Sequence, residues 1–382
     1  MKVLFIVQGE GRGHMTQALT LADALRNNGH EIVGVLVGKS KSRSLPQFFK
    51  DGIKAPVEQF ESPNFLPTPA NKRSKITRSV AYNVCRLHRY ASSILFINRR
   101  IKQSGADLVV NFYELLTGLT YLIMQPDVPQ VSIGHQYLFL HSDFKLPQVN
   151  KASLMSLRLF TIVTSLGATE RLALSFKEME DDKKHHICVV PPLIRKDVLE
   201  LTGSKGNYLH GYMVNAGFGE CVLEWHKKHP EVPLNFFWDK KGAKETEQVD
   251  DTLTFHQIND RKFIESMAGC KAYATTAGFE SVCEAMYLGK PIMMVPAHIE
   301  QDCNAYDACQ CGAGIVSDDF NIDRLLSFAA DYRPNETFHR WAQCGGSRIT
   351  ASLEKAACNH ETHTSGLLSY ARSGMAYIRR AL

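Results

Sequence analysis

The sequence predicts an α/β protein made of two Rossmann-like β/α/β domains. The chain opens with a strand, a glycine-rich turn, a helix and a second strand, all within residues 2–37. A second β/α series starts near residue 208, after a stretch rich in proline and then in Gly, Ser and Lys. The length of 382 residues is comfortable for two domains of ordinary size.

The first domain is expected to be built on a parallel sheet. Residues 2–7 form a short apolar run, which is typical of a buried parallel strand. The turn from Gly9 to His14 follows, and the next residues have helical spacing with Gly29 as the stop. Further apolar runs predict strands at 31–37, 107–112, 129–134, 170–176 and 186–191, with a helix before the last two.

The stretch from Ser62 to Ala106 contains no acidic residue. Its proline-rich beginning predicts an exposed loop, and residues 75–105 predict one long helix, or two, with an apolar and a basic face. Most of the basic face is expected to be solvated surface. The alternative is peripheral contact with an anionic membrane or an anionic lipid-linked acceptor, where each basic residue contributes about 1 kcal/mol. The basic residues are Lys72, Arg73, Lys75, Arg78, Arg86, Arg89, Arg99, Arg100 and Lys102.

Composition and charge restrict the compartment and the class of partner. The net charge is +5, with 18 Lys and Arg against 10 Asp and Glu in residues 1–150 and 26 against 29 in the remainder. Neither a signal peptide nor a membrane-spanning apolar stretch is recognised, and the ten cysteines have no zinc-site spacing. A cytoplasmic protein is expected, with the inner face of the membrane as a peripheral site. Nucleic acid is not expected as a partner, because no nucleic-acid-binding motif occurs.

The domain boundary is predicted from composition. Pro191-Pro192 stiffens the end of the first domain, and residues 203–207 resemble a flexible linker. The predicted limits are a first domain at 1–195, a linker at 196–206, a second domain at 207–360 and a basic amphipathic helix at 361–382. In the second domain, strands are expected at 208–213, 234–239, 253–258, 271–274 and 292–295, with helices ending near His229, starting near Arg261 and spanning 279–288.

The stretch Thr275–Gly314 carries the strongest functional signal. A strand turns at Gly278 into a helix, and Gly289 fits its C-cap. The free N–H groups and the positive dipole end at such a helix start favour a phosphate or diphosphate. Ser281 adds a hydroxyl in the first turn, and Glu284 is placed to accept from the hydroxyls of a ribose. Further on, the acid and amide groups of Glu300, Gln301 and Asn304 are candidates to read sugar hydroxyls.

This stretch resembles the nucleotide-sugar-binding segment of the two-Rossmann (GT-B) glycosyltransferases. The UDP-glycosyltransferases and the lipid II-forming N-acetylglucosaminyltransferase carry the same pattern at similar spacing. Here it reads Gly278, Glu284, Gly289-Lys290-Pro291, Pro296, Glu300-Gln301 and Asn304-Ala305. The resemblance implies two domains that face each other across a cleft, with the second domain binding the donor and the terminal helix crossing back to the first. Its donor-binding residues would be Gly278, Phe279, Glu280, Ser281, Glu284, Glu300, Gln301, Asn304, Ile258, Asn215 and Gly217.

The glycine loop of the first domain has two interpretations. A dinucleotide fold opens in the same way, but His14 replaces the third glycine and no acid follows the second strand, so NAD is not expected. Lys39, Lys41 and Arg43 leave NADP as a weak alternative. The loop also resembles the first loop of the GT-B enzymes, which makes His14 a candidate base for the acceptor hydroxyl. The opposite interpretation, that His14 only orients the loop, stays open. Candidates on the acceptor side are Gly11, Gly13 and the pairs Tyr113-Glu114 and His135-Gln136, which follow two predicted strands. The plainer interpretation of each pair is a loop residue or a helix cap.

The expected activity is that of a hexosyltransferase-type glycosyltransferase. It would move a sugar from a nucleotide-diphosphate sugar, a UDP-sugar in the resembling families, to an acceptor hydroxyl with inversion. No Asp-x-Asp motif occurs, so no metal and no cofactor are expected. The acceptor would be lipid-linked, as in cell-envelope glycan synthesis, or a small glycan or aglycone. The alternatives are a UDP-sugar 2-epimerase and a non-catalytic nucleotide-sugar-binding protein.

Two positions depart from the resembling families. Thr276 stands where the plant-type enzymes have a histidine that touches the diphosphate. Glu280 would repel a diphosphate unless its side chain turns outward.

Overall fold

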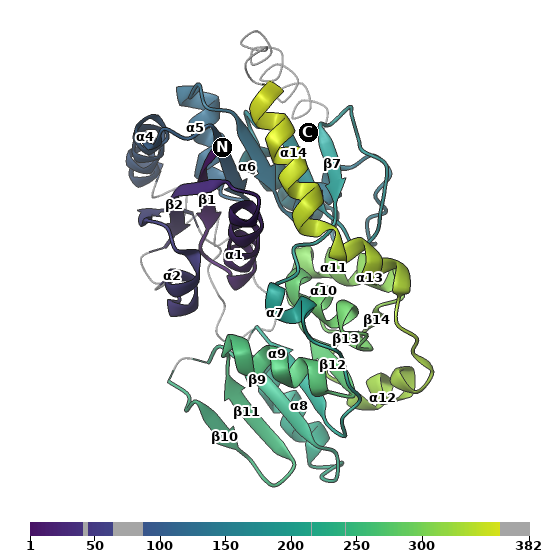
Figure 1. Cartoon of the computed structure of the whole chain (residues 1–382). Helices are drawn as coiled ribbons and strands as arrows, with labels where there is room; N and C mark the ends of the chain where they lie inside the picture. The colour runs from purple at the N-terminus through teal and green to yellow at the C-terminus, as the bar shows by residue number, and fades with distance from the viewer. Residues whose placement is uncertain (41–44, 64–86, 215, 241, 360–382) are drawn as a thin grey trace.

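The computed structural model describes residues 1–40, 45–63, 87–214, 216–240 and 242–359. These residues form two seven-stranded sheets, each accompanied by its own helices (Figure 1). The prediction of a two-domain α/β fold is therefore confirmed.

The first sheet is parallel throughout and has the order β3-β2-β1-β4-β5-β6-β7. In β1, five consecutive buried residues show a central strand that is covered on both faces. The strands are β1 (Lys2–Gln8), β2 (Glu31–Lys39), β3 (Val57–Glu61), β4 (Leu108–Phe112), β5 (Gln130–Ile133), β6 (Glu170–Leu174) and β7 (Ile187–Val190). The helices are α1 (Arg12–Asn27), α2 (Gln47–Ile53), α4 (Leu87–Ser104), α5 (Leu115–Met124), η1 (His135–Leu140) and α6 (Lys151–Thr164).

The second sheet has the order β10-β11-β9-β8-β12-β13-β14, in which β10 is antiparallel to β11 and the other described pairs are parallel. The strands are β8 (Leu209–Met213), β9 (Leu234–Trp238), β10 (Thr246–Gln248), β11 (Leu253–Gln257), β12 (Ala272–Thr275), β13 (Ile292–Met294) and β14 (Gly314–Val316). The helices are η2 (Ala216–Phe218), α8 (Gly219–His226), α9 (Asp260–Gly269), α10 (Phe279–Tyr287), α11 (Ile299–Gln310), α12 (Ile322–Asp331) and α13 (Glu336–Gln343).

Both sheets reverse their strand order beside the first strand of the domain. The reversal lies between β1 and β4 in the first sheet and between β8 and β12 in the second. In open α/β sheets, ligands bind at the carboxyl ends of the strands at such a point. The topology therefore predicts a ligand site at the loops after β1, β4 and β12.

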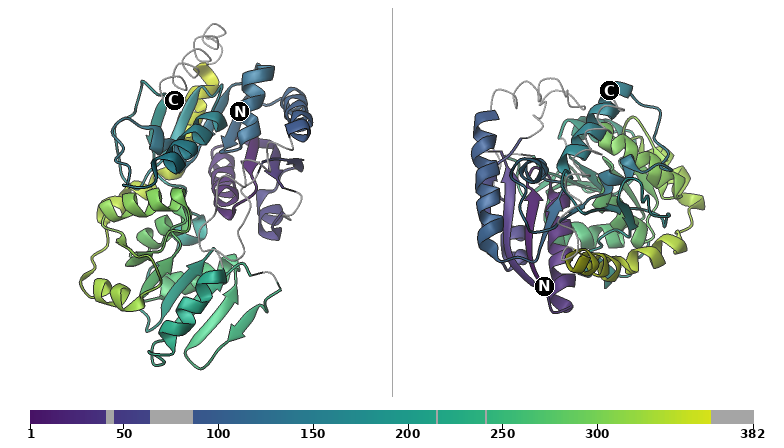
Figure 2. Two further views of the ribbon diagram at one scale, coloured as in Figure 1. Left: turned by 180° about the vertical axis from the view of Figure 1, so that it is seen from behind. Right: turned by 90° about the horizontal axis from the view of Figure 1, so that it is seen from above.

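Helix α14 (Gly345–Asn359) returns to the first domain (Figures 1 and 2). It lies against α1 and β7, and the His30 Nε2 atom is 2.8 Å from Glu354 Oε1. The sequence places this range in the second domain and the crossing at residues 361–382, which lie outside the described residues. The predicted domain limits otherwise stay predictions.

The connection between the domains is packed against the second domain. It contains the short helix α7 (Lys196–Leu199), in which Val198 is fully buried. A Cβ atom added at Gly203 would lie 2.1 Å from the Leu288 carbonyl oxygen, and one at Gly206 would lie 2.4 Å from that of Gly269. Both glycines are needed for close backbone approach, whereas composition alone suggests flexibility.

Candidate functional site

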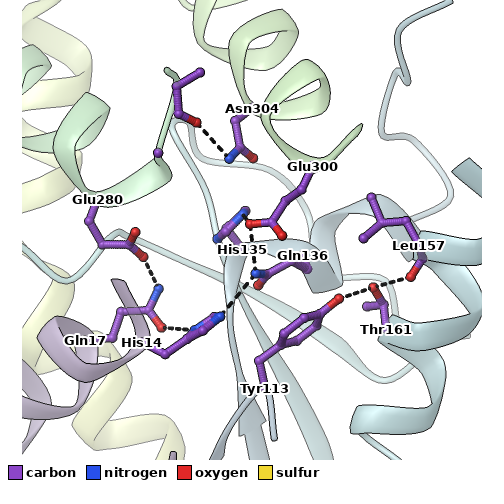
Figure 3. Close-up of polar contacts among 12 residues, drawn as sticks. His14, Gln17, Tyr113, His135, Gln136, Leu157, Thr161, Glu280, Glu300 and Asn304 are labelled. Atoms are coloured by element: carbon purple, nitrogen blue, oxygen red, sulfur yellow. Dashed lines mark hydrogen bonds and ion pairs between the residues drawn. The ribbon is translucent and has the colours of Figure 1, made fainter. Parts of the chain in front are cut away.

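Polar side chains from both domains come together where the two sheets face each other (Figure 3). The loops and helix starts after β1, β4 and β5 bring side chains of the first domain to this place, and the starts of α10 and α11 bring those of the second. At this place Gln17 donates a hydrogen bond to Glu280, and Gln136 donates one to Glu300, across the domain boundary. We call this set the interdomain cluster: His14, Gln17, Tyr113, His135, Gln136, Glu280 and Glu300.

His14 lies in the first turn of α1, for which Gly11 is the N-cap residue. His14 is 8% exposed, and its ring stacks on that of Tyr113 with centroids 5.5 Å apart. Nδ1 lies 3.2 Å from Gln17 Oε1, and Nε2 lies 3.4 Å from Gln136 Nε2. Burial lowers the pKa of His14, which the nearby carboxylates raise only in part. A neutral imidazole in this setting has the protonation state that a general base requires.

In each domain, one residue in the turn that leads to the interdomain cluster has a left-handed backbone conformation. Tyr113 follows β4 with φ of +59°, and Ala277 follows β12 with φ of +62°. Left-handed conformations are costly for residues with a Cβ atom and concentrate at functional sites. Each strained residue lies just before the N-cap of a helix, Glu114 for α5 and Gly278 for α10. The strain therefore shapes the two turns that present the interdomain cluster.

The carboxylate of Glu280 points at the first domain. It accepts a hydrogen bond from the Gln17 side-chain amide across the domain boundary. A Cβ atom added at Gly13 would lie 2.4 Å from Glu280 Oε2, so only glycine allows this approach. The outward turn that the sequence requires of Glu280 is directed at the start of α1, where the helix dipole favours a negative charge.

Glu300 is surrounded by histidines. Its Oε1 atom lies 3.2 Å from His135 Nε2 and accepts a hydrogen bond of the same length from Gln136. Burial acts to raise the pKa of Glu300, but the hydrogen bond and charge of His135, and the charges of His298 and His14, lower it to about 2. Glu300 is therefore ionised throughout the physiological range.

Glu284 forms a bidentate ion pair that the sequence does not predict. Arg195 donates from Nε to Oε1 at 2.6 Å and from Nη2 to Oε2 at 2.8 Å. The Glu284 side chain is 3% exposed and that of Arg195 is 19% exposed. Arg195 also lies 3.7 Å from Asp260, which pairs with Arg12 at 3.3 Å. The predicted contact of Glu284 with a ribose would have to use the remaining lone pairs of this carboxylate.

The other predicted donor residues lie near the starts of α10 and α11. Gly278 is the N-cap of α10, and the Ser281 hydroxyl donates to the Gly278 carbonyl at 3.2 Å. Gln301 Oε1 accepts from the Ala297 N–H at 2.8 Å, and Asn304 Nδ2 donates to the Ala277 carbonyl at 3.2 Å. These bonds fix the turns after β12 and β13, so they hold the side chains in place for the predicted role.

Two of the predicted donor residues, Ile258 and Gly217, do not belong to the interdomain cluster. The Ile258 N–H donates to the Trp238 carbonyl at 3.0 Å and continues the ladder between β9 and β11. Gly217 is exposed in the short helix η2 after β8. Asn215 lies outside the described residues.

Glu114 is fully buried, and its side chain is hydrogen-bonded within the first domain. Its Oε1 atom accepts from the Ser62 hydroxyl at 2.5 Å and from the Leu116 N–H at 3.1 Å, which caps α5. Burial raises its pKa to about 7, although these two hydrogen bonds act in the opposite direction. The hydrogen bonds of this side chain hold the loop after β4 in place, and its predicted contact with an acceptor stays a prediction.

Two residues of the site were missed in the sequence. Gln17 lies one turn after His14 on the same helix face, so its spacing to His14 was a usable signal. Arg195 is the last residue of the predicted first domain, and the sequence predicts no role for it. No local signal connects it to Glu284, which is 89 residues away.

The described residues show neither a cluster of metal ligands nor a helix that could span a membrane. They contain no group of three or more His, Cys, Asp or Glu side chains that could hold a metal ion. Within the same residues, every helix is too short or too polar to span a membrane.

Comparison with known proteins identifies the family. The model of the family described as glycosyl transferase family 1 matches residues 1–332. The structure of the kitacinnamycin glycotransferase aligns with a TM-score of 0.63 at 14% identity, covering 93% of this chain and 99% of that chain. Arabidopsis thaliana UGT89C1 complexed with UDP-L-rhamnose gives 0.58 at 15% identity, with 94% and 98% covered. VinC in complex with DTDP gives 0.55 at 14% identity, with 94% and 99% covered. No curated protein matches the chain.

The lipid II-forming subgroup is not singled out by these comparisons. What they do establish agrees with the two sheets and with the strand reversals described above. The chain belongs to glycosyl transferase family 1 and is a glycosyltransferase with the GT-B fold.

Proposed function

We propose that the chain moves a sugar from a nucleotide-diphosphate sugar, with a UDP-sugar as the first candidate, to an acceptor hydroxyl. We further propose that the transfer inverts the anomeric centre and needs no metal. The observation that carries the proposal is the meeting of buried His14 with the starts of α10 and α11. The complexes of UGT89C1 with UDP-L-rhamnose and of VinC with DTDP support the class of donor.

On the donor side, the diphosphate is assigned to the start of α10. Gly278 lacks a side chain, and the N–H groups of Phe279, Glu280 and Ser281 have no partner within the helix. Such N–H groups favour an anion and stabilise the charge that develops on a leaving diphosphate. Glu280 is held toward α1 by Gln17, which is compatible with an anion at this helix start.

On the acceptor side, His14 is assigned as the base. The acceptor hydroxyl gives its proton to His14 while its oxygen attacks the anomeric carbon. The bond from that carbon to the diphosphate breaks, and its electron pair leaves with the phosphate oxygen. Attack from the face opposite the leaving group inverts the anomeric centre.

A panel of nucleoside diphosphates in a thermal-shift assay tests the donor. A nucleotide at a hundredfold excess over its Kd adds about 2.7 kcal/mol to the free energy of unfolding. The proposal expects the largest shift from UDP, and the absence of any shift would contradict it. The anomeric configuration of the product by NMR tests inversion, and activity after EDTA treatment tests metal independence.

Assays of the same protein distinguish the transferase from two alternatives, a UDP-sugar 2-epimerase and a non-catalytic binding protein. A 2-epimerase would change the donor sugar with no acceptor present, and a binding protein would bind UDP-sugars without transfer. For a transferase, His14→Ala slows transfer and leaves donor binding in place, whereas Glu284→Gln weakens donor binding. Unchanged turnover in both variants would exclude the transferase assignment.

We also propose peripheral contact between the first domain and an anionic membrane. Leu95, Arg99 and Lys102 lie on one exposed face of α4, and Ile123 is 60% exposed on the neighbouring α5. Basic and apolar groups side by side suit an anionic interface. Residues 72–86 of the basic stretch lie outside the described residues. In the described part, Arg89 pairs with Glu61 and Arg100 with Glu58.

Flotation with anionic liposomes tests this contact. Binding at low salt that weakens at high salt is expected, and Ile123→Asp should reduce it. Leu199→Asp, at a 38% exposed position on α7, is the matched control. Absence of binding at either salt concentration would end the proposal.

A further inference from the structure

The orientation of the Gln17 amide is fixed by its partner in the other domain. Its Nε2 atom donates to Glu280 Oε1, and a carboxylate in its ionised form only accepts hydrogen bonds. The NH2 group of Gln17 therefore faces Glu280, and the carbonyl oxygen Oε1 faces His14 Nδ1 at 3.2 Å. An amide oxygen only accepts, so Nδ1 of His14 must carry the proton.

A second contact leads independently to the same tautomer. Gln136 Nε2 donates to Glu300 Oε1 at 3.2 Å, which places its NH2 group 3.4 Å from His14 Nε2. The opposite amide orientation would set the Gln136 carbonyl oxygen against the Glu300 carboxylate. A donor that faces His14 Nε2 requires a lone pair on that atom. Because this contact is long, an acceptor hydroxyl can replace Gln136 as the donor to Nε2.

We propose that Gln17 and Glu280 are positioning residues that set the proton of His14 on Nδ1 and leave Nε2 as the basic atom. Glu280 belongs to the second domain, so this setting exists only while the two domains are in contact. The base is thereby completed by the domain that holds the donor. This inference rests on the proposed role of His14 as the base in glycosyl transfer.

The packing around Gln17 supports a specific role. Gln17 is 1% exposed, and Gly13 on the same helix gives the Glu280 carboxylate room to reach it. The ionisable groups that act on His14 are Glu280 of α10, Glu300 of α11 and His135 of η1. After proton transfer, the imidazolium keeps its Nδ1–H bond to Gln17, and both carboxylates favour its charge.

The tautomer is measured directly by NMR of protein labelled with 15N-histidine. The His14 signals are assigned by their loss in His14→Ala, and the two ring nitrogens are distinguished by their chemical shifts and couplings. We expect a protonated Nδ1 in the unsubstituted protein and a mixture of tautomers in Gln17→Ala. A protonated Nε2 in the unsubstituted protein, or no change in Gln17→Ala, would overturn the inference.

Kinetics test the consequence for transfer. Gln17→Ala is expected to lower kcat by roughly 10- to 100-fold, a part of what a general base contributes, with the donor KM within about twofold. In the double variant Gln17→Glu/Glu280→Gln, the carboxylate stands at position 17 and the amide at position 280. It can still accept from Nδ1–H, so most of the rate should return, with the acidic limb of the kcat profile moved to higher pH. A double variant whose kcat does not exceed that of Gln17→Ala would count against the positioning role of Gln17 and Glu280.

The proposed transfer activity and the proposed tautomer of His14 can fail separately, and the kinetic test has a matched control. Gln47→Ala removes an exposed glutamine that donates to Asp51 at 2.7 Å on α2, and it should leave kcat unchanged. If no nucleotide sugar supports transfer by the unsubstituted protein, the proposed function fails. The NMR result then still decides whether Gln17 sets the tautomer of His14.

Discussion

The imidazole of His135 lies flat against the ring of Phe279, with ring centroids 4.5 Å apart and planes 6° apart. The two residues belong to different domains, and Phe279 is the first residue of the helix assigned to the diphosphate. Phe279 also packs on Phe176 of the first domain at 4.7 Å. One aromatic side chain thus connects the start of α10, where we propose that the donor binds, to the first domain.

Phe279→Leu is expected to weaken this connection. Loss of the aromatic contacts should lower the free energy of unfolding by about 1 kcal/mol and raise the donor KM, because the helix start is no longer held. Urea denaturation and initial rates measure the two effects. Phe328 of α12 forms a tilted ring pair with Tyr332, the C-cap residue of that helix, at 5.6 Å. Phe328→Leu is the control for loss of an aromatic contact and should leave the donor KM unchanged.

Arg195→Ala is expected to destabilise the protein by about 3 kcal/mol, since it leaves the buried Glu284 carboxylate without its partner. The double variant Arg195→Met/Glu284→Leu, which removes both charges, should recover much of that loss. The neighbouring ion pair of Lys196 and Glu200 is 74% and 65% exposed. Lys196→Ala should therefore change stability by less than about 0.5 kcal/mol. Equal effects of Arg195→Ala and Lys196→Ala in urea denaturation would contradict the assigned difference.

Gly13→Ala is expected to change helix stability and the contact between the domains in opposite directions. Within α1, alanine should favour the helix by about 0.5–1 kcal/mol. Its Cβ atom would nevertheless displace the Glu280 carboxylate, so we expect transfer to slow by about tenfold while the fold is kept. Adding Glu280→Asp shortens the side chain by one methylene and should restore part of the rate. Full activity of Gly13→Ala alone would show that the close approach is dispensable.

The raised pKa of Glu114 leads us to expect that the free energy of unfolding depends on pH. Its folded-state pKa of about 7 lies above its ordinary value of 4.5, mainly because of burial. The folded protein therefore binds this proton more tightly than the unfolded chain does. The contribution to stability is fully present below pH 4.5, declines as pH rises to 7, and is lost above it, by about 3 kcal/mol in all.

Glu114→Gln should remove this dependence. The variant is expected to be more stable than the unsubstituted protein at pH 8, and this advantage should disappear toward pH 5. Urea denaturation at the two pH values provides the measurement, with the exposed Glu200→Gln as control. An advantage that is the same at both pH values would exclude Glu114 as the source.

Most of the fold was predictable because its signals are local. Apolar runs predict the strands of both sheets except β3, β10 and β14, which are short or polar. Glycines with positive φ stand at the predicted stops Gly29 and Gly289. The start of α10 at Phe279 follows from Gly278 and the strand before it. Glycine composition was less informative at Gly203 and Gly206, since a glycine needed for close packing looks the same in sequence as one in a flexible linker.

The sequence by itself determined that two β/α domains present a glycine loop with His14 and a helix start at Phe279. Only the tertiary structure decided which polar groups meet there. Glu280 is bound to Gln17 over a separation of 263 residues, and Glu284 to Arg195 over 89. Strand periodicity and helix caps depend on near neighbours in the chain, whereas these pairs depend on how the two domains are placed against each other.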